Sequence, residues 1–169
     1  MTASDNWCTP KWLTDLLGTF DLDPCSNASS TVRAEYVCRL GYDNCVMNDR
    51  RVSLHGDGLE FDWSTRSVFV NPPYSDPLPW CRKLRDHNAP WCALLKLDPS
   101  TRWWAALMEA TPTVAPFRKR LKFESTPASE TEHAKGMTAN FPSVLLFKRW
   151  YPSDELAAHL WLPTYRMVA

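Results

Sequence analysis

The sequence predicts a single α/β domain built on a mostly parallel sheet. Its 169 residues suit one domain. A hydrophobic fraction of 44%, with 9 Trp and 7 Phe, is typical of a packed core and excludes an intrinsically disordered chain. Between residues 67 and 109, apolar strand-like segments alternate with helix-like segments, and this alternation is the pattern of parallel strands joined by helices.

The first expected helix is marked at both ends. Thr9 is a favourable N-cap, Pro10 fits the first helical position and Gly18 is a typical terminator, which predicts a helix over residues 9–17. The other elements depend on apolar periodicity. They are strands over 20–24, 45–47, 52–54, 67–70, 92–97, 121–123 and 143–147, and helices over about 31–40, 78–85, 100–109 and 153–161.

The last two expected strands differ from the others in their connection. No clear helix lies between them, so they are expected to pair antiparallel and close the sheet. The polar stretch 124–138 between them is expected to be a loop. We expect one domain over residues 1–169, with a core over about 7–150 and a C-terminal helical tail over 151–169.

The clearest chemical signal is the tetrapeptide Asn71-Pro72-Pro73-Tyr74. It follows an expected buried strand, and open α/β sheets bind ligands beyond the carboxyl ends of their strands. The side-chain oxygen of Asn71 and the carbonyl of Pro72 can accept the two N–H groups of a planar amine, and proline gives a rigid turn. Two such acceptors stabilise the positive charge that an amine gains during methyl transfer. Tyr74 can stack on a base that has left its duplex.

The tetrapeptide resembles the (D/N/S)-P-P-(Y/F/W) loop of amino-methyltransferases. Alone, this resemblance leaves enzymes that act on a base amine, on ribosomal RNA and on protein glutamine all open. The order of three further motifs is similar to that of one permutation class of adenine methyltransferases. These motifs are Thr9-Pro10, Leu22-Asp23-Pro24-Cys25 and Gly56-Asp57-Gly58-Leu59.

More closely, the chain resembles the compact phage-type DNA N6-adenine methyltransferases, the phage Dam family. The matching pieces are residues 7–10, 20–27, 57–59 with Trp63, 68–75 and 141–147. The resemblance implies a Rossmann-like class I methyltransferase domain, with a mostly parallel seven-stranded sheet and an antiparallel closing strand. It also implies S-adenosyl-L-methionine as the cofactor, and double-stranded DNA with a flipped adenine as the substrate.

The resemblance implies roles for particular residues. Catalytic roles fall on Asn71, Pro72, Pro73 and Tyr74. Cofactor binding falls on Trp7, Thr9, Pro10, Asp23, Pro24, Cys25, Ser26, Asp57, Leu59 and Asn71. An acidic residue for the cofactor ribose is expected between the two acidic motifs, where Asp43 and Asp49 both fit. The chain departs from the superfamily's glycine-rich cofactor loop, because small polar residues occupy positions 26–29.

Charge and composition limit the kinds of partner that the protein can have. The 19 basic and 19 acidic residues cancel, so affinity for DNA must come from local patches. The cluster Arg118, Lys119, Arg120 and Lys122 can bind phosphates, and a merely solvated surface is the equal alternative. No signal peptide or apolar membrane span is seen, so we expect a cytoplasmic protein. We also expect a monomer or a homodimer. We expect no metal site, since the cysteines form no CxxC pair, although Cys38, Cys45 and His55 offer a less favoured alternative.

Two alternatives to adenine methylation of DNA remain at this point. The same tetrapeptide can hold the amine of cytosine N4 or of an RNA base. A non-catalytic protein that keeps the cofactor fold and binds a partner is an alternative of another class. Because a methyltransferase core uses nearly all of the chain, no separate recognition domain fits, and we expect low sequence selectivity.

Overall fold

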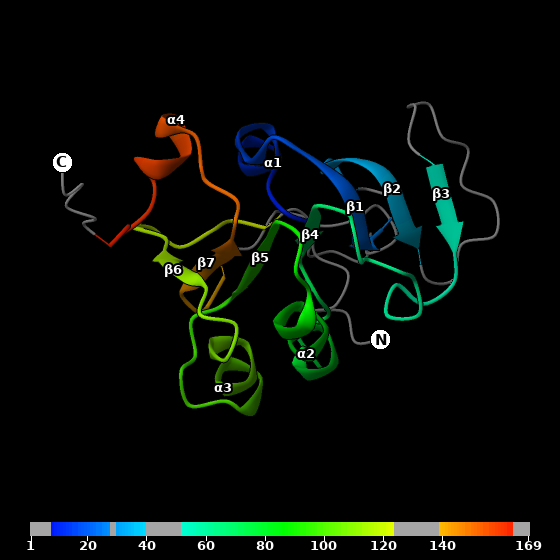
Figure 1. Cartoon of the computed structure of the whole chain (residues 1–169). Helices are drawn as coiled ribbons and strands as arrows, with labels where there is room; N and C mark the ends of the chain where they lie inside the picture. Colours follow the sequence, from blue (N-terminus) through cyan, green and yellow to red (C-terminus); the bar gives the residue numbers. More distant parts are fainter. Residues whose placement is uncertain (1–7, 28–29, 40–51, 124–138, 164–169) are drawn as a thin grey trace, which may run out of the picture.

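The computed structural model describes residues 8–27, 30–39, 52–123 and 139–163. Their strands form one sheet in the order β3-β2-β1-β4-β5-β7-β6 (Figure 1). The elements are α1 (Lys11–Leu17), β1 (Thr19–Ser26), β2 (Arg33–Arg39), β3 (Val52–His55), β4 (Val68–Val70), α2 (Leu78–Asp86), β5 (Trp91–Lys96), α3 (Arg102–Met108), β6 (Thr113–Pro116), β7 (Ser143–Lys148) and α4 (Asp154–Ala157). The predicted α/β class is confirmed.

The predicted mostly parallel sheet is also confirmed. Strand β1 pairs parallel with β2 and β4, and the parallel pairing continues outward to β3 and β5. Strand β7 runs antiparallel to both of its neighbours, β5 and β6. Because β1, β2, β3, β4 and β5 all run parallel, their carboxyl ends lie along the same edge of the sheet.

The helix expected over residues 31–40 is wrong, because this segment forms strand β2. Its exposed residues Arg33 and Glu35 alternate with the buried residues Val32 and Ala34, which are 3% and 4% exposed. This period of two suits a strand, and the strand pairs on both sides, with β1 and β3. Pairing in the sheet therefore overrides the local helix propensity of Arg-Ala-Glu.

The strand expected over residues 121–123 is also wrong. Leu121 and Phe123 are buried on either side of the exposed Lys122, which imitates a strand, but the ladder partner of β7 is β6. Proline at the last position of β6 is tolerated because β6 is the edge strand of this sheet. The strand expected over 45–47 and the loop expected over 124–138 lie outside the described residues.

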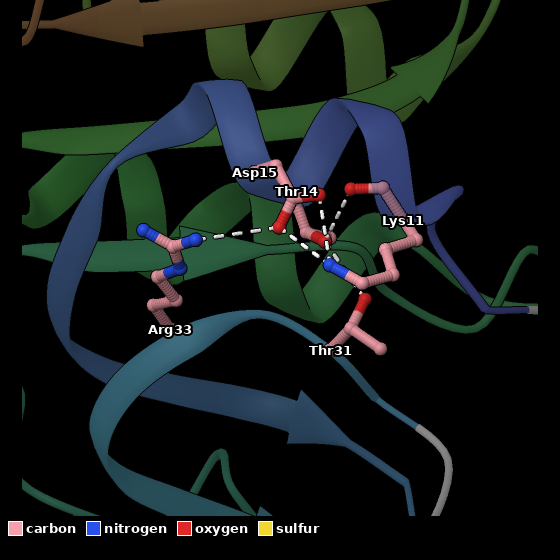
Figure 2. Close-up of polar contacts among 5 residues, drawn as sticks. All are labelled: Lys11, Thr14, Asp15, Thr31 and Arg33. Atoms are coloured by element: carbon pink, nitrogen blue, oxygen red, sulfur yellow. Dashed lines mark hydrogen bonds and ion pairs between the residues drawn. The ribbon is translucent and has the colours of Figure 1, made fainter.

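Helix α1 ends as expected but begins one residue later than the sequence suggests. Pro10 occupies the N-cap position in place of Thr9, and the positive φ of Gly18, 80°, ends the helix. The Thr14 hydroxyl lies 2.7 Å from the Thr31 hydroxyl, which ties α1 to the segment before β2 (Figure 2). On the exposed side, Asp15 accepts hydrogen bonds from Lys11 and Arg33 (Figure 2).

Helix α4 is shorter than the predicted helix 153–161. Ser153 caps it as expected, since its hydroxyl accepts from the Leu156 amide at 3.3 Å. After Ala157 the chain turns back to the sheet, because Leu160 bridges to Phe117 and the Trp161 amide donates to a backbone carbonyl. None of the helices that the structure describes is long and apolar enough to cross a membrane.

Helices cover both faces of the sheet, α1 and α4 on one face and α2 and α3 on the other (Figure 1). Each face has its own apolar cluster. Leu13 of α1 and Leu156 of α4 belong to the first cluster, and both are fully buried. Leu84 of α2 and Leu107 of α3 belong to the second. The residues of β5 alternate between the two clusters, so this strand lies at the centre of the core.

A buried histidine caps helix α2 and makes stability depend on pH. The His87 Nε2 atom lies 2.9 Å from the Arg66 carbonyl oxygen, which can only accept, so Nε2 carries the hydrogen. Burial lowers the pKa of His87 below its ordinary value of 6.5. The neutral ring is therefore the form that the folded protein favours.

We predict that the free energy of unfolding decreases as the pH falls below about 6.5. The unfolded chain takes up a proton at the ordinary histidine pKa, whereas folded His87 resists protonation, so the contribution is fully present above that pH. Urea denaturation at pH 7.5 and 5.5 measures the loss. The variant His87→Gln, whose amide can still donate to Arg66, should show a smaller difference between the two pH values. An equal difference in both proteins would contradict the prediction.

Candidate active site

The carboxyl ends of the parallel strands bring the predicted motifs to one edge of the sheet. Asp23 lies near the end of β1, Asp57 follows β3 and Asn71 follows β4. Lys96 is the last residue of β5. Residues that are far apart in sequence therefore meet where open α/β sheets bind their ligands.

Asp23 organises the segment that follows it. Its side chain is 3% exposed, and its two oxygens accept from the Cys25 amide at 3.2 Å and from the Ser30 hydroxyl at 3.3 Å. The register of β1 against β2 shifts between Asp23 and Ser26, across Pro24. Cys25 and Ser26 are the last two residues of β1. The buried Asp23 carboxylate shapes the turn that follows the strand, through its bond to Ser30.

The Asp57 segment packs directly on the Asp23 segment. A Cβ atom added at Gly58 would lie 2.0 Å from the Pro24 carbonyl oxygen, so only glycine permits this approach. The Asp57 carboxylate accepts from the Leu59 amide at 2.9 Å and fixes the turn. Asp57 and Leu59 are both half-buried. The two predicted cofactor motifs are therefore neighbours in space.

Two side chains from elsewhere hold this turn in place, and sequence reasoning missed both roles. The Trp63 indole donates to the Gly58 carbonyl at 3.0 Å. The Lys83 ammonium group, on α2, donates to the carbonyls of Leu59 and Phe61 at 2.5 and 2.6 Å. It also lies 4.6 Å from the centre of the Trp63 ring. The helix after the tetrapeptide is thereby joined to the turn that carries Asp57.

The tetrapeptide begins with a side chain that the N-terminal motif holds. The Asn71 Nδ2 atom donates to the Thr9 hydroxyl at 3.1 Å, across 62 residues of sequence. Thr9 is 5% exposed, and Pro10 and Pro72 are buried beside these residues in sequence. With Nδ2 directed to Thr9, the Asn71 side chain has its carbonyl oxygen left as an acceptor.

Tyr74 lies in an aromatic cluster. Its ring makes edge-to-face contacts with Phe123 and Phe141, at centroid distances of 6.2 and 5.4 Å. The Lys96 ammonium group lies 5.1 Å from the centre of the Tyr74 ring and 4.7 Å from that of Phe141. The Tyr74 hydroxyl is buried without a hydrogen-bond partner among the described residues. Burial raises the pKa of Tyr74 far above its usual value, so the hydroxyl stays protonated.

Three members of this cluster are additions to the predicted site. Phe141 lies in a segment that the resemblance covered, but no role was expected for it. Lys96 carries a weak signal, since it is the one charged residue in the otherwise apolar strand β5. Phe123 carries none, because only the fold brings it to Tyr74.

The predicted basic cluster leads toward Tyr74. Arg118, Lys119, Arg120 and Lys122 are all exposed, and Phe123 follows them. Arg118 also donates to the Leu160 carbonyl at 3.0 Å and lies 4.0 Å from the centre of the Trp161 ring. The two arginines thus have structural partners, since Arg120 donates to the carbonyl of Ala139.

Several predicted residues remain outside this geometry. Trp7, Asp43 and Asp49 lie outside the described residues, so the choice of a ribose ligand stays open. Cys45 does too, which leaves the alternative metal site untested. Within the described part of the chain, no group of three or more His, Cys, Asp or Glu side chains is placed to hold a metal ion.

We predict that Gly58→Ala lowers the free energy of unfolding by about 1–3 kcal/mol, the usual cost of overpacking. The added methyl group meets backbone atoms of Pro24, which cannot move without shifting β1. Thermal or urea unfolding measures the effect. Glu60→Ala, an exposed position in the same turn, is the control and should change stability little. Unfolding of Gly58→Ala at the wild-type midpoint would show that the close approach is absent.

Comparison with known proteins identifies the family of the chain. The family model described as DNA N-6-adenine-methyltransferase (Dam) matches residues 1–159. A DNA N-6-adenine-methyltransferase of Haemophilus phage HP1 (strain HP1c1) is 28% identical over 109 residues, which cover 59% of this chain and 54% of that protein. The match thus spans about half the length of this relative. Because the family model covers nearly the whole chain, the protein belongs to the DNA N-6-adenine-methyltransferase (Dam) family.

Proposed function

We propose that this protein transfers a methyl group from S-adenosyl-L-methionine to the N6 amine of adenine in DNA. The observation that carries the proposal is the Asn71 amide, fixed by Thr9 at the same sheet edge as Asp23 and Asp57. The name of the family supports adenine in DNA as the acceptor, ahead of cytosine or an RNA base.

The residues at this edge fit a cofactor with an adenine, a ribose and a methionine part. The half-buried Asp57 carboxylate can accept from the cofactor's adenine amine, and Leu59 offers an apolar contact to the ring. Pro24, Cys25 and Ser26 would line the remainder, with Asp23 shaping the turn from within. When bound, the cofactor supplies a methyl group on a positively charged sulfur.

The acceptor side needs hydrogen-bond acceptors and no nucleophilic side chain. The Asn71 side-chain oxygen and the Pro72 carbonyl would take the two N–H groups of the adenine amine. They stabilise the amine as it loses conjugation with the ring and gains positive charge. The protonated Tyr74 and its aromatic neighbours form an apolar wall for a flipped base, and stacking of this kind contributes roughly 1–3 kcal/mol.

The same proposal covers the fold type and the setting. The antiparallel strand β7 between β5 and β6 supports a Rossmann-like class I methyltransferase domain that occupies residues 1–169. We infer low sequence selectivity, with the DNA contacts of this domain made by loops at the carboxyl ends of its strands. The enzyme would act in the cytoplasm, where its DNA substrate lies.

We predict that Asn71→Ala lowers the methylation rate at least about 100-fold, the usual cost of removing one group that stabilises a transition-state charge. Affinity for S-adenosyl-L-methionine should change much less than the rate, because the Asp23 and Asp57 segments would supply most of the contacts to the cofactor. Mass analysis of nucleosides from treated plasmid DNA measures the product, and calorimetry measures cofactor binding. Asn88→Ala, which truncates an exposed asparagine after α2, is the matched control.

Each product of this experiment has a separate meaning. N6-methyladenine from the wild type, lost in Asn71→Ala, supports the proposal. N4-methylcytosine, or methylation of RNA alone, would replace it by one of the alternative acceptors. Cofactor binding by the wild type without any turnover would favour a non-catalytic binding protein.

We also predict that Lys119→Ala with Lys122→Ala weakens DNA binding. Both lysines are exposed on the segment that leads to Phe123. Loss of two phosphate contacts should reduce the slope of log K against log salt concentration by about 2. Fluorescence anisotropy with a DNA duplex at several salt concentrations measures the slope. Arg82→Ala on α2 is the control, and an unchanged slope in the double variant would assign this cluster to the solvated surface.

A further inference from the structure

Two consecutive buried residues bind to two different loops of the candidate site. The Cys8 Sγ atom donates to the Asn27 side-chain oxygen at 3.2 Å. The Thr9 hydroxyl accepts from Asn71 Nδ2 at 3.1 Å. Cys8 and Thr9 are 4% and 5% exposed. Asn27 follows β1 and Asn71 follows β4, and these strands are neighbours in the sheet.

These two loops belong to opposite sides of the proposed reaction. The loop that begins at Asn27 continues from the Asp23 segment, which would hold the cofactor. The loop that begins at Asn71 would hold the amine. Consecutive Cα atoms are separated by a fixed distance of about 3.8 Å, so one dipeptide bonded to both loops limits how far apart they can move.

The dipeptide is itself anchored. The Pro10 carbonyl accepts from the amides of Leu13 and Thr14 at 2.9 and 3.1 Å, which joins it to α1. The pyrrolidine ring of Pro10 also restricts the backbone of the residue before it, Thr9. Helix α1 is in turn tied to Thr31 through Thr14 (Figure 2).

The bond to Thr9 also holds the Asn71 amide in an orientation that suits the substrate. An amine offers two donors, so it needs the carbonyl oxygen of Asn71. The Thr9 hydroxyl engages the NH₂ end of the amide, which leaves that oxygen as the acceptor. Without the hydroxyl, this orientation loses a hydrogen bond that stabilises it.

We propose that Cys8-Thr9 is a positioning element that sets the amine-binding loop against the cofactor-binding loop. Thr9 acts through Asn71, and Cys8 acts through Asn27. This role differs from the direct cofactor contact that the resemblance implied for Thr9, and it rests on the proposed methyl transfer. In this role neither residue would touch the reacting atoms.

The test separates the two halves of the element. Thr9→Val keeps the shape of the side chain and removes the hydroxyl, so kcat should fall about tenfold while the Kd of S-adenosyl-L-methionine stays within about twofold. Thr9→Ser keeps the hydroxyl and should therefore keep most of the wild-type kcat. Cys8→Ala should instead raise the cofactor Kd severalfold, with a smaller effect on kcat.

A helix cap away from both loops provides the control. The Ser153 hydroxyl accepts from the Leu156 amide at 3.3 Å and caps α4, in the segment that follows β7. Ser153→Ala should lower the melting temperature but leave kcat and the cofactor Kd at their wild-type values. An equal loss of kcat in Ser153→Ala and Thr9→Val would reduce the effect to general stability and overturn the proposal.

Other results overturn it in distinct ways. Wild-type kcat in Thr9→Val would show that Asn71 needs no partner. A raised cofactor Kd with normal kcat in Thr9→Val would make Thr9 a cofactor contact. An equal loss of kcat in Thr9→Ser and Thr9→Val would show that the Thr9 hydroxyl is not responsible for the effect. If the wild type forms no N6-methyladenine, the proposed function falls and this inference with it, whereas the results above remove the inference alone.

Discussion

The position of β1 between β2 and β4 is the constraint on which the candidate site depends. Asp23 lies near the end of β1, and the next residue, Pro24, positions the turn that carries Asp57. Gly58 packs against the Pro24 carbonyl so closely that no side chain fits between them. The Asp57 turn therefore takes its position from β1, and β4 delivers Asn71 alongside.

The sequence pattern alone was enough to predict those helices and strands whose ends are marked by particular residues. Helix α1 has a proline and a glycine at its two ends, and β4 is an apolar run that stops at the tetrapeptide. Strand β2 could not be predicted in this way, because Arg33, Ala34 and Glu35 at its start form helices readily, and pairing with β1 and β3 selects the strand. Strand β6 was missed because it has four residues and ends in a proline.

The candidate site shows the same division. The residue types at Asp23, Asp57 and Asn71 could be recognised from the sequence, since each lies near the end of a strand or just after it and suits a chemical task. Their partners could not. A hydrogen bond between Thr9 and Asn71 has no sequence signature, and Lys83 is an ordinary helix lysine until the fold turns it toward two carbonyls.

The direction of β7 has a consequence for how this kind of protein can diversify. Because β7 runs against β5 and β6, it begins at the edge where they end, and the connection from Pro116 to Ser143 leaves and re-enters the sheet at the candidate site. That connection carries the basic cluster and contributes Phe123 and Phe141 around Tyr74. Under the proposed function, insertions and substitutions there would alter the contacts with DNA, while the strands that carry Asp23 and Asn71 remain unchanged. DNA contact and methyl transfer would then be able to change independently during evolution.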